Sequence, residues 1–218
     1  MKNKLLVSML LTAAAFQTPA FSAVTNDASL IAIVEDFETF DGFVTQGPVA
    51  LAGGLQVVSS IDSTLGAVGV DLGENGIWGA GNKVAGIGDL SFNPLSVDYD
   101  GSMTFTRNSA TDGIGALFSI YQEVNGTAEI LLEALSQVGD VLESTSLLIN
   151  FADPLLYDVG TFAGFIRASN DIYGLRVSGD GFVLDNVAVG VVPVPAALPL
   201  FLSGLSVLGF AARRRRAN

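Results

Sequence analysis

The sequence predicts an all-β protein built as an antiparallel β-sandwich, and three observations support this. The middle of the chain is rich in Val, Ile, Phe, Thr and Gly, which favour strands and their turns. Turn dipeptides such as Asp100-Gly101 and Asn125-Gly126 recur at short intervals and supply the positive φ that tight reversals need. No repeat of roughly 20 to 50 residues is visible, which argues against a solenoid or a propeller.

Nine candidate strands lie between these turns, a number that suits one sandwich. The strands are Leu30 to Phe37, Val49 to Ser60, Ser102 to Arg107, Gly115 to Gln122, Ala128 to Leu135, Leu147 to Phe151, Phe162 to Arg167, Ile172 to Val177 and Gly181 to Val189. Residues 23–190 therefore form one domain of a size that can bury a sizeable core.

Two segments fit the strand pattern less simply. Residues 128 to 138 carry apolar residues at both helical and strand spacing, and a hairpin closed by Gly139-Asp140 into Val141 to Thr145 favours a strand. Between Gly66 and Gly88, eight of 23 residues are glycine. So many glycines predict an irregular connection, with one strand around Ala67 to Asp71.

The N-terminus has the plan of a secretory signal peptide covering residues 1–22. Lys2 and Lys4 precede an apolar stretch, and small residues follow around Ala20 to Ala23. Cleavage after Ser22 places Ala20 at the small-residue position, whereas cleavage after Ala23 places bulky Phe21 there. The alternative is an uncleaved N-terminal anchor.

The C-terminus, residues 191–218, combines a proline motif, an apolar run and a basic cluster. Residues 196–212 carry no charge and, as a helix rising about 1.5 Å per residue, span roughly 26 Å, enough for one marginal transmembrane helix. The basic cluster, residues 213–216, stops transfer and keeps the C-terminus in the cytoplasm. The motif and the cluster consist of Val192, Pro193, Val194, Pro195 and Ala196, and of Arg213, Arg214, Arg215 and Arg216.

In this order, the three parts resemble the PEP-CTERM class of bacterial sorting signals, in its VPLPA-CTERM variant, with Val194 in place of Leu. The resemblance implies that an exosortase-type protease in the membrane recognises the motif and cuts the precursor. It also implies export by a Gram-negative bacterium that makes extracellular polysaccharide. The alternative is a permanent membrane anchor.

Charge is divided sharply along the chain. All 22 acidic residues lie between Asp27 and Asp185, and this body carries only four basic residues, a formal charge of −18. Nucleic acid is therefore excluded as a partner, because phosphate binding needs clustered Lys and Arg. The chain has no Cys and no His, which removes disulfides, Cys or Ser-His-Asp nucleophiles and zinc fingers.

From Ser102 onward the order of elements also resembles a jelly-roll, galactose-binding-like domain, and the ending Leu184-Asp185-Asn186-Val187 is similar to those of carbohydrate-binding sandwiches. In such domains, the resemblance implies, a structural calcium joins the first strand to the last. Carboxylates are the ligands that Ca²⁺ prefers. The expected calcium ligands are Glu35, Asp36, Glu38 and Asp185. The alternative is that Asp185 only hydrogen-bonds a turn.

Aromatic side chains are the candidates for contact with sugars, on whose faces they stack. Trp78, the only tryptophan, lies in the glycine-rich segment and is the first candidate; Tyr99, Tyr121, Tyr157 and Tyr173 are the others. Most aromatic residues of a sandwich fill its core instead.

These observations predict a non-enzymatic protein of the cell surface or extracellular matrix. Its role is structural or adhesive in biofilm or exopolysaccharide, with the exosortase-type protease, the membrane and extracellular polysaccharide as partners. The alternative is a carbohydrate-binding module with a specific glycan ligand. A third interpretation is a glycoside hydrolase, which needs only two carboxylates at a defined separation.

Overall fold

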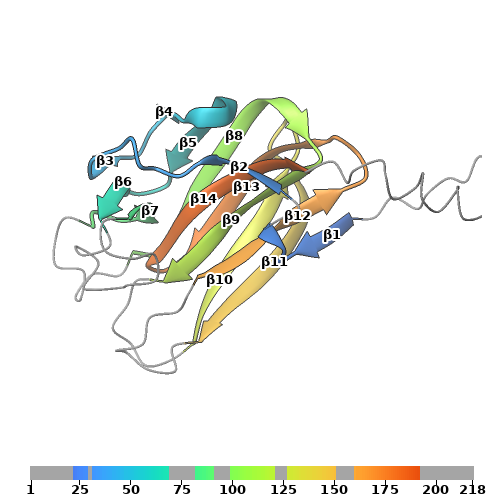
Figure 1. Cartoon of the computed structure of the whole chain (residues 1–218). Helices are drawn as coiled ribbons and strands as arrows, with labels where there is room; N and C mark the ends of the chain where they lie inside the picture. The colour runs from blue at the N-terminus through green and yellow to red at the C-terminus, as the bar shows by residue number, and fades with distance from the viewer. Residues whose placement is uncertain are drawn as a thin grey trace, which may run out of the picture.

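The computed structural model describes residues 22–28, 31–68, 82–90, 99–120, 127–150 and 160–191. These residues fold as two antiparallel β-sheets packed face to face, which confirms the predicted β-sandwich (Figure 1). Most of the predicted signal peptide, the whole sorting motif with its basic cluster, and Trp78 lie outside the described residues. Within them, no helix is both long and apolar enough to cross a bilayer.

The larger sheet has eight strands in the order β1-β12-β9-β14-β7-β6-β3, with β2 as a second partner of β14. Its strands are β1 Ser22–Thr25, β2 Ile31–Glu35, β3 Phe43–Thr45, β6 Ser63–Val68, β7 Lys83–Ile87, β9 Gly113–Ile120, β12 Thr161–Arg167 and β14 Phe182–Val191. The strand β1 begins at the residue after which signal-peptide cleavage is expected.

The smaller sheet has six strands in the order β11-β10-β13-β8-β5-β4. These strands are β4 Val49–Ala50, β5 Leu55–Ser59, β8 Gly101–Thr111, β10 Thr127–Leu135, β11 Val141–Asn150 and β13 Ile172–Gly179. From β7 to β14 the chain crosses between the sheets at every connection except the β10–β11 hairpin. Such crossing is the connection pattern of jelly-roll sandwiches.

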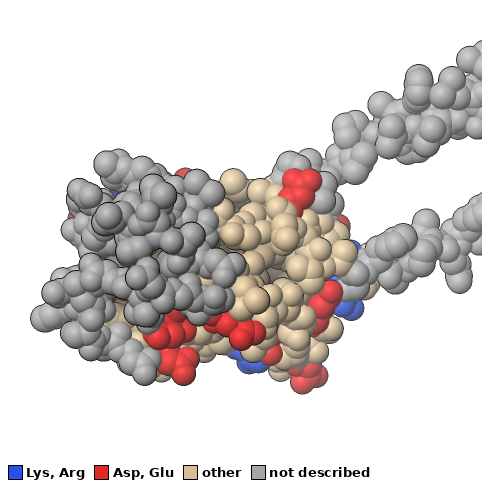
Figure 2. All heavy atoms as spheres, turned by 90° about the horizontal axis from the view of Figure 1, so that it is seen from below, with Lys and Arg blue, Asp and Glu red and all other residues tan. Residues whose placement is uncertain are grey.

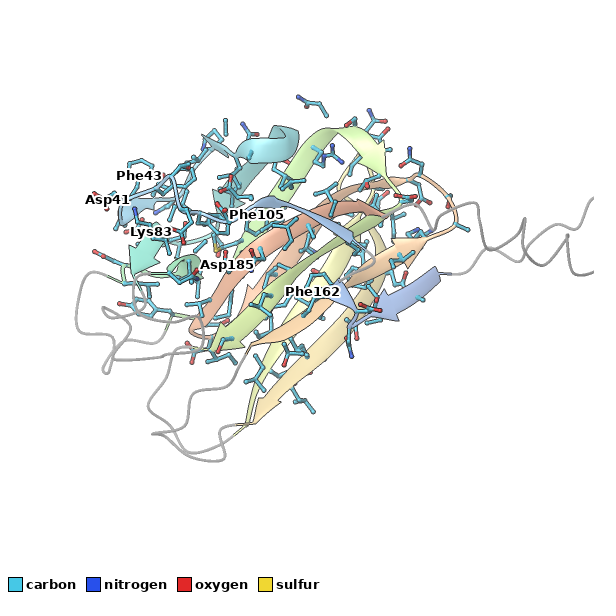
Figure 3. All side chains as sticks on the ribbon, in the orientation of Figure 1. Asp41, Phe43, Lys83, Phe105, Phe162 and Asp185 are labelled. Carbon is cyan, nitrogen blue, oxygen red and sulfur yellow. The ribbon has the colours of Figure 1, made fainter. Side chains whose placement is uncertain are left out.

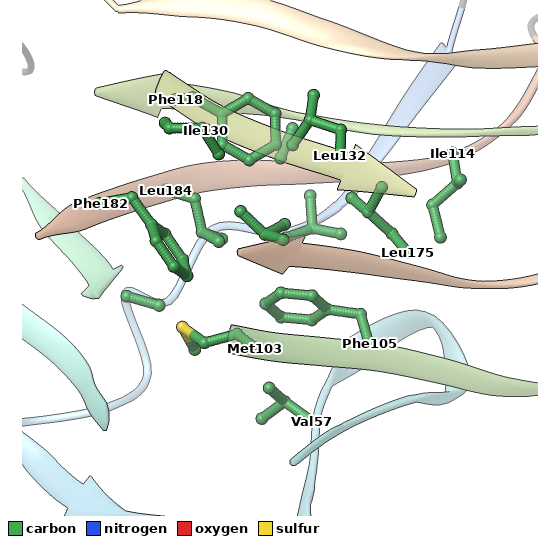
Figure 4. Close-up of a cluster of buried hydrophobic side chains, with 14 of the residues drawn as sticks. Val57, Met103, Phe105, Ile114, Phe118, Ile130, Leu132, Leu175, Phe182 and Leu184 are labelled. Carbon is green, nitrogen blue, oxygen red and sulfur yellow. The ribbon is translucent and has the colours of Figure 1, made fainter. Parts of the chain in front are cut away.

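The core lies between the two sheets and is built from alternate residues of each strand. Val57, Met103 and Phe105 of the smaller sheet face Phe118 and Leu184 of the larger one, and all five side chains are buried (Figure 4). Because strand residues alternate between faces, burial of these side chains fixes which residues point outward. Burying one such side chain contributes about 1.5–3 kcal/mol.

Several strand boundaries differ from the predictions. Residues 49 to 60 are not one strand, because η2 Ala52–Gly54, with Gly53 at φ 64°, separates β4 from β5. The predicted hairpin at Gly139-Asp140 is confirmed, but β11 runs on to Asn150 where two strands were expected. Fourteen strands occur among the described residues, against nine candidate strands and two further segments at Ala67 to Asp71 and Val141 to Thr145, since short edge strands leave little periodicity in the sequence.

The glycine-rich segment is ordered at both ends. Strands β6 and β7 pair with each other, with an irregularity between Leu65 and Ala67. Gly66 occupies this irregularity at φ 76°, and a Cβ there would lie 2.5 Å from the backbone carbon of Phe40. The backbone of Phe40 can approach β6 only because residue 66 has no side chain. Residues 69–81 lie outside the described part of the chain.

We expect Gly66→Ala to destabilise the protein more than Gly139→Ala does. Gly139 also has positive φ, 88°, but no atom lies within 4 Å of the place that its Cβ would take, so its substitution carries only the backbone cost. That cost is about 1–3 kcal/mol, and overpacking at Gly66 adds about 1–3 kcal/mol. Urea denaturation of both variants measures the difference, and equal losses would show that the approach of Phe40 is relaxed easily.

Candidate functional site

The strand β14 changes its neighbour halfway along one edge. Val183 and Leu184 pair with β7, whereas Val187 to Val191 pair with β2, and β9 follows the opposite edge. The end of β2 and the start of β7 therefore meet beside Asp185 and Asn186. Asn186 has φ 53°, and the pairing with β9 shifts register between Asp185 and Ala188, so the strand is irregular at this point.

Asp185 is buried at this junction, with 3% of its surface exposed. Its Oδ2 accepts a hydrogen bond from Asn82 Nδ2 at 3.1 Å, and its Oδ1 accepts one from the Asn186 N–H at 2.6 Å. Burial, together with the charges of Asp36 and Glu38, raises the pKa of Asp185 to about 6, although both hydrogen bonds act to lower it. Figure 3 shows Asp185 on the same side of the sandwich as Lys83 and Asp41.

Glu35 is buried as well, at 4% exposed, and joins the two sheets. Its Oε1 accepts a hydrogen bond from the Phe37 N–H and its Oε2 accepts one from the Ala52 N–H, both at 2.8 Å. These bonds hold the turn after β2 and tie it to η2 beside the smaller sheet. Phe37 has φ 56° and is fully buried, so the side chain of Glu35 supports a strained turn.

The structure brings the predicted calcium ligands into one region without forming a ligand set. Asp36 and Glu38 are exposed, and Glu38 Oε1 accepts a hydrogen bond from the Lys83 N–H at 3.0 Å. In the described residues, no group of three or more acidic side chains is arranged to hold a metal ion. Calcium binding by Glu35, Asp36, Glu38 and Asp185 therefore stays a prediction.

A pocket of about 240 Å³ lies beside the junction, between β2 and η2. Glu35, Asp36 and Phe40 are among the residues that line it, together with Ile33, which is 55% exposed. Lys83 closes the adjoining turn, because its Nζ donates a hydrogen bond to the Phe40 carbonyl at 2.6 Å and pairs with Asp41 at 3.5 Å. The pocket is thus acidic, partly aromatic and held by ordered backbone.

The outward face of the six-stranded sheet is a second candidate surface. Register places Arg176 opposite Glu133 on one side and Thr104 on the other, and Thr104 opposite Val58. Arg176 Nε donates a hydrogen bond to Glu133 Oε2 at 2.5 Å. We name this set, with its outward neighbours, the polar face; the neighbours are Gln56, Ser102, Thr106, Ser144, Ser146 and Ser178.

The predicted aromatic contacts are only partly described. Tyr99 is buried, and its hydroxyl donates a hydrogen bond to the Asp89 carbonyl at 3.1 Å, so it belongs to the fold. Tyr173 is half-buried, while Trp78, Tyr121 and Tyr157 lie outside the described residues. Sequence reasoning missed Phe40 and the polar face. Alternation of Ser and Thr with core residues in Ser102 to Thr106 is the signal that identifies the face.

No protein-family model and no curated protein matches the chain. Among solved structures, an arabinose-bound GH51 α-L-arabinofuranosidase is 11% identical over 76% of this chain and 27% of its own, with a TM-score of 0.40. The CBM22-1 xylan-binding domain of Paenibacillus barcinonensis Xyn10C is 14% identical over 77% of this chain and 99% of its own, with a TM-score of 0.35. The chain thus covers nearly the whole of that domain and spans about a quarter of the length of the arabinofuranosidase.

We expect Asp185 to make stability fall as the pH rises from about 4 to about 6. Its pKa is near 6 when folded and 3.8 when unfolded, so the folded state binds the proton more tightly in this window. Stability is highest below the unfolded value, and raising the pH through the folded value removes about 2–3 kcal/mol. Asparagine at position 185 cannot titrate. In the Asp185→Asn variant, the free energy of unfolding, measured by urea denaturation with chelator present, should therefore fall less steeply with rising pH. Parallel curves for the two proteins would contradict the assignment.

The same denaturation curves, repeated with millimolar calcium in place of chelator, test the predicted metal site. Calcium bound through Asp185 stabilises the folded protein by mass action. The wild-type protein should then gain stability near neutral pH and Asp185→Asn should not. An unchanged wild-type curve would reject the calcium prediction and leave the pH result unaffected.

Proposed function

We propose that this protein is an exported, non-catalytic β-sandwich that adheres to extracellular polysaccharide through the polar face. The observation that carries the proposal is the row Glu133, Arg176 and Thr104, which lies in register across three neighbouring strands. Hydroxyl, amide and guanidinium groups at strand spacing suit the repeating hydroxyl groups of a sugar chain. The strands β10, β13 and β8 are neighbours in the six-stranded sheet, as such a surface requires.

The burial pattern supports a solvent-facing role for this sheet. Thr106, Gln56, Ser144 and Ser146 are exposed, while Arg176 and Glu133 are partly covered. The side chains of Leu131 and Leu148 are also exposed, at 38% and 61%, and give the face apolar contacts beside the polar row. A mixture of oriented polar groups and apolar contact area is what small-molecule and glycan sites commonly use.

Surface charge limits the kind of polysaccharide that this protein retains. On the side of the molecule drawn in Figure 2, acidic side chains outnumber basic ones among the described residues. An acidic body repels polyanionic chains at low salt and accepts neutral or cationic ones. The polar face is therefore proposed for a neutral polysaccharide.

Export and sorting complete the proposal. The signal-peptide pattern and the PEP-CTERM-like tail support delivery through the inner membrane and processing by an exosortase-type protease. The precursor is then anchored only transiently, and the processed protein is retained at the cell surface or in the matrix. If no polysaccharide is bound, a purely structural role in the matrix is the remaining function.

We expect the double variant Glu133→Gln with Arg176→Gln to lose at least tenfold in affinity for the neutral polysaccharide that the protein binds. The exchange removes both charges together, so net charge is unchanged and neither partner is left alone. Affinity electrophoresis across a panel of neutral polysaccharides measures binding. A charge-neutral change at a second ion-paired group, Arg167→Gln with Asp171→Asn, is the control; it also removes the pairing of Arg167 with Glu143 and should leave affinity intact.

Two results would contradict the proposed function. Equal loss in both double variants would show that binding does not depend on the polar face. Release of reducing sugar from a bound polysaccharide would show that the protein is an enzyme. Melting curves of each variant establish that a loss of binding is not a loss of folding.

The exported protein should have an intact mass that lacks residues 1–22 and the arginine cluster at 213–216. Processing at or near the motif 192–196 removes the apolar run with the cluster. Mass spectrometry of the surface fraction measures this, with whole-cell precursor as the reference. Recovery of the full C-terminus from the surface fraction would instead indicate a permanent anchor.

A further inference from the structure

We propose that the pocket between β2 and η2 binds the ammonium group of an amino sugar, with Glu35 and Asp36 facing the charge and Phe40 facing the sugar ring. This inference rests on the proposed function, because it takes polysaccharide as the ligand. It adds a second, chemically distinct subsite at the β4 edge of the six-stranded sheet, where Ala50 lines the pocket and pairs with Gln56 of the polar face. Three features of the pocket lead to it: its size, its uncompensated carboxylates and its aromatic wall.

The pocket is small and built from two separate parts of the chain. Its volume of about 240 Å³ lies below the roughly 300–1,000 Å³ of typical small-molecule sites, so a single sugar unit is the largest fitting ligand. One wall comes from β2 and the turn that follows it, and the other from residues 50–52. The bond between Glu35 Oε2 and the Ala52 N–H joins the two walls and fixes their spacing.

Glu35 gives the pocket a buried carboxylate without a cationic partner. In the described part of the chain, no Lys or Arg lies within ion-pair distance of it. Each oxygen accepts one backbone N–H, so each has a second lone pair for which the described residues supply no donor. Burying a carboxylate without a countercharge is costly, so a bound cation would stabilise this arrangement.

The surroundings add negative charge and little positive charge. Asp36 lines the same pocket, and one of its oxygens accepts a hydrogen bond from the Glu38 N–H at 3.3 Å. Lys83 is the neighbouring cation, but its ammonium is engaged by the Phe40 carbonyl and Asp41 (Figure 3). An anionic sugar would be repelled here, and a neutral one would leave the charge of Glu35 uncompensated.

The aromatic wall distinguishes an amino sugar from a bare metal ion. Phe40 is half-buried, packs against the core and lies 6.4 Å from the Phe37 ring, which holds it in place. A phenyl ring attracts an ammonium group within about 6 Å and also covers the apolar face of a sugar ring. A calcium ion would bind only the carboxylate oxygens and would make no favourable contact with the phenyl ring.

The test compares glucosamine oligosaccharides with fully N-acetylated oligosaccharides of the same length, by calorimetric titration of the protein with chelator present. The two ligands share a backbone and differ in the charge of each amino group. We expect the glucosamine oligosaccharide to bind at least tenfold more tightly. Asp36→Asn should weaken that binding severalfold, whereas Asp140→Asn, the same change in the exposed β10–β11 turn, should not.

Phe40→Leu, which keeps an apolar side chain but removes the ring, should weaken binding as well in folded protein. The charge-neutral polar-face variant, Glu133→Gln with Arg176→Gln, should bind glucosamine oligosaccharide like the wild-type protein. Equal affinity for both ligands, or equal losses in the Asp36 and Asp140 variants, would overturn the proposal. Loss of glucosamine binding in the polar-face variant would also overturn it, by placing the ligand on the six-stranded sheet.

The two proposals fail separately. If neutral polysaccharide binds through the polar face and glucosamine oligosaccharide does not bind, the pocket proposal alone is wrong. If glucosamine oligosaccharide binds through Asp36 and no neutral polysaccharide binds, the polar-face proposal alone is wrong.

Discussion

The pairing of β14 with three other strands is the constraint on which the rest of the structure depends. One edge of β14 is occupied by β9, and the other is shared by β7 and then β2, so the last strand holds both early parts of the chain in the larger sheet. A strand that is central over its whole length buries its backbone groups and needs a partner for each of them. At the change of partner, between Leu184 and Val187, regular pairing with the neighbouring strands is interrupted. Hydrogen bonds that the ladder does not supply there must come from side chains.

The carboxylates of Asp185 and Glu35 accept hydrogen bonds around this interruption, and the candidate site lies beside them. Asp185 bonds Asn82 and the Asn186 N–H beside β7, while Glu35 bonds the N–H groups of Phe37 and Ala52 beyond β2. Both carboxylates are buried, at 3% and 4% exposed. Both accept hydrogen bonds from N–H groups and neither pairs with a cation among the described residues, which leaves this end of the sandwich negative. Such an arrangement has structural and binding consequences at once, since the groups that order the turn also form the wall of the pocket.

Much of the sandwich could be predicted from the sequence, because strand periodicity reports directly on burial. The alternation in Ala128 to Leu135 and the turn at Gly139-Asp140 predicted the β10–β11 hairpin, and the structure confirms it. The break at Gly53 was not predicted, although the pair Gly53-Gly54 within Val49 to Ser60 is a turn signal. The sequence could not predict that β2 and β7 share an edge of β14, because strand pairing over such separations leaves no local pattern. The predicted ligands Asp36, Glu38 and Asp185 do lie in one region, but no metal-holding group is formed among the described residues, since hydrogen bonds to backbone and amide groups engage these carboxylates.

The use of the few basic residues suggests how the two proposed subsites differ. Lys83 joins β7 to the turn that contains Phe40 and Asp41, and Arg167 joins Glu143 of β11 to Asp171, so both cations connect separate segments. Arg176 instead pairs with its immediate cross-strand neighbour on an open sheet, with 35% of its side chain exposed. An ion pair so exposed adds about 0–1 kcal/mol to stability, so stability alone explains poorly why one of the few basic residues lies there. Binding of a ligand that accepts hydrogen bonds from the Arg176 guanidinium explains this position better. The polar face thus offers a donor to neutral sugars, whereas the pocket beside Glu35 offers carboxylate acceptors and favours a sugar that carries positive charge.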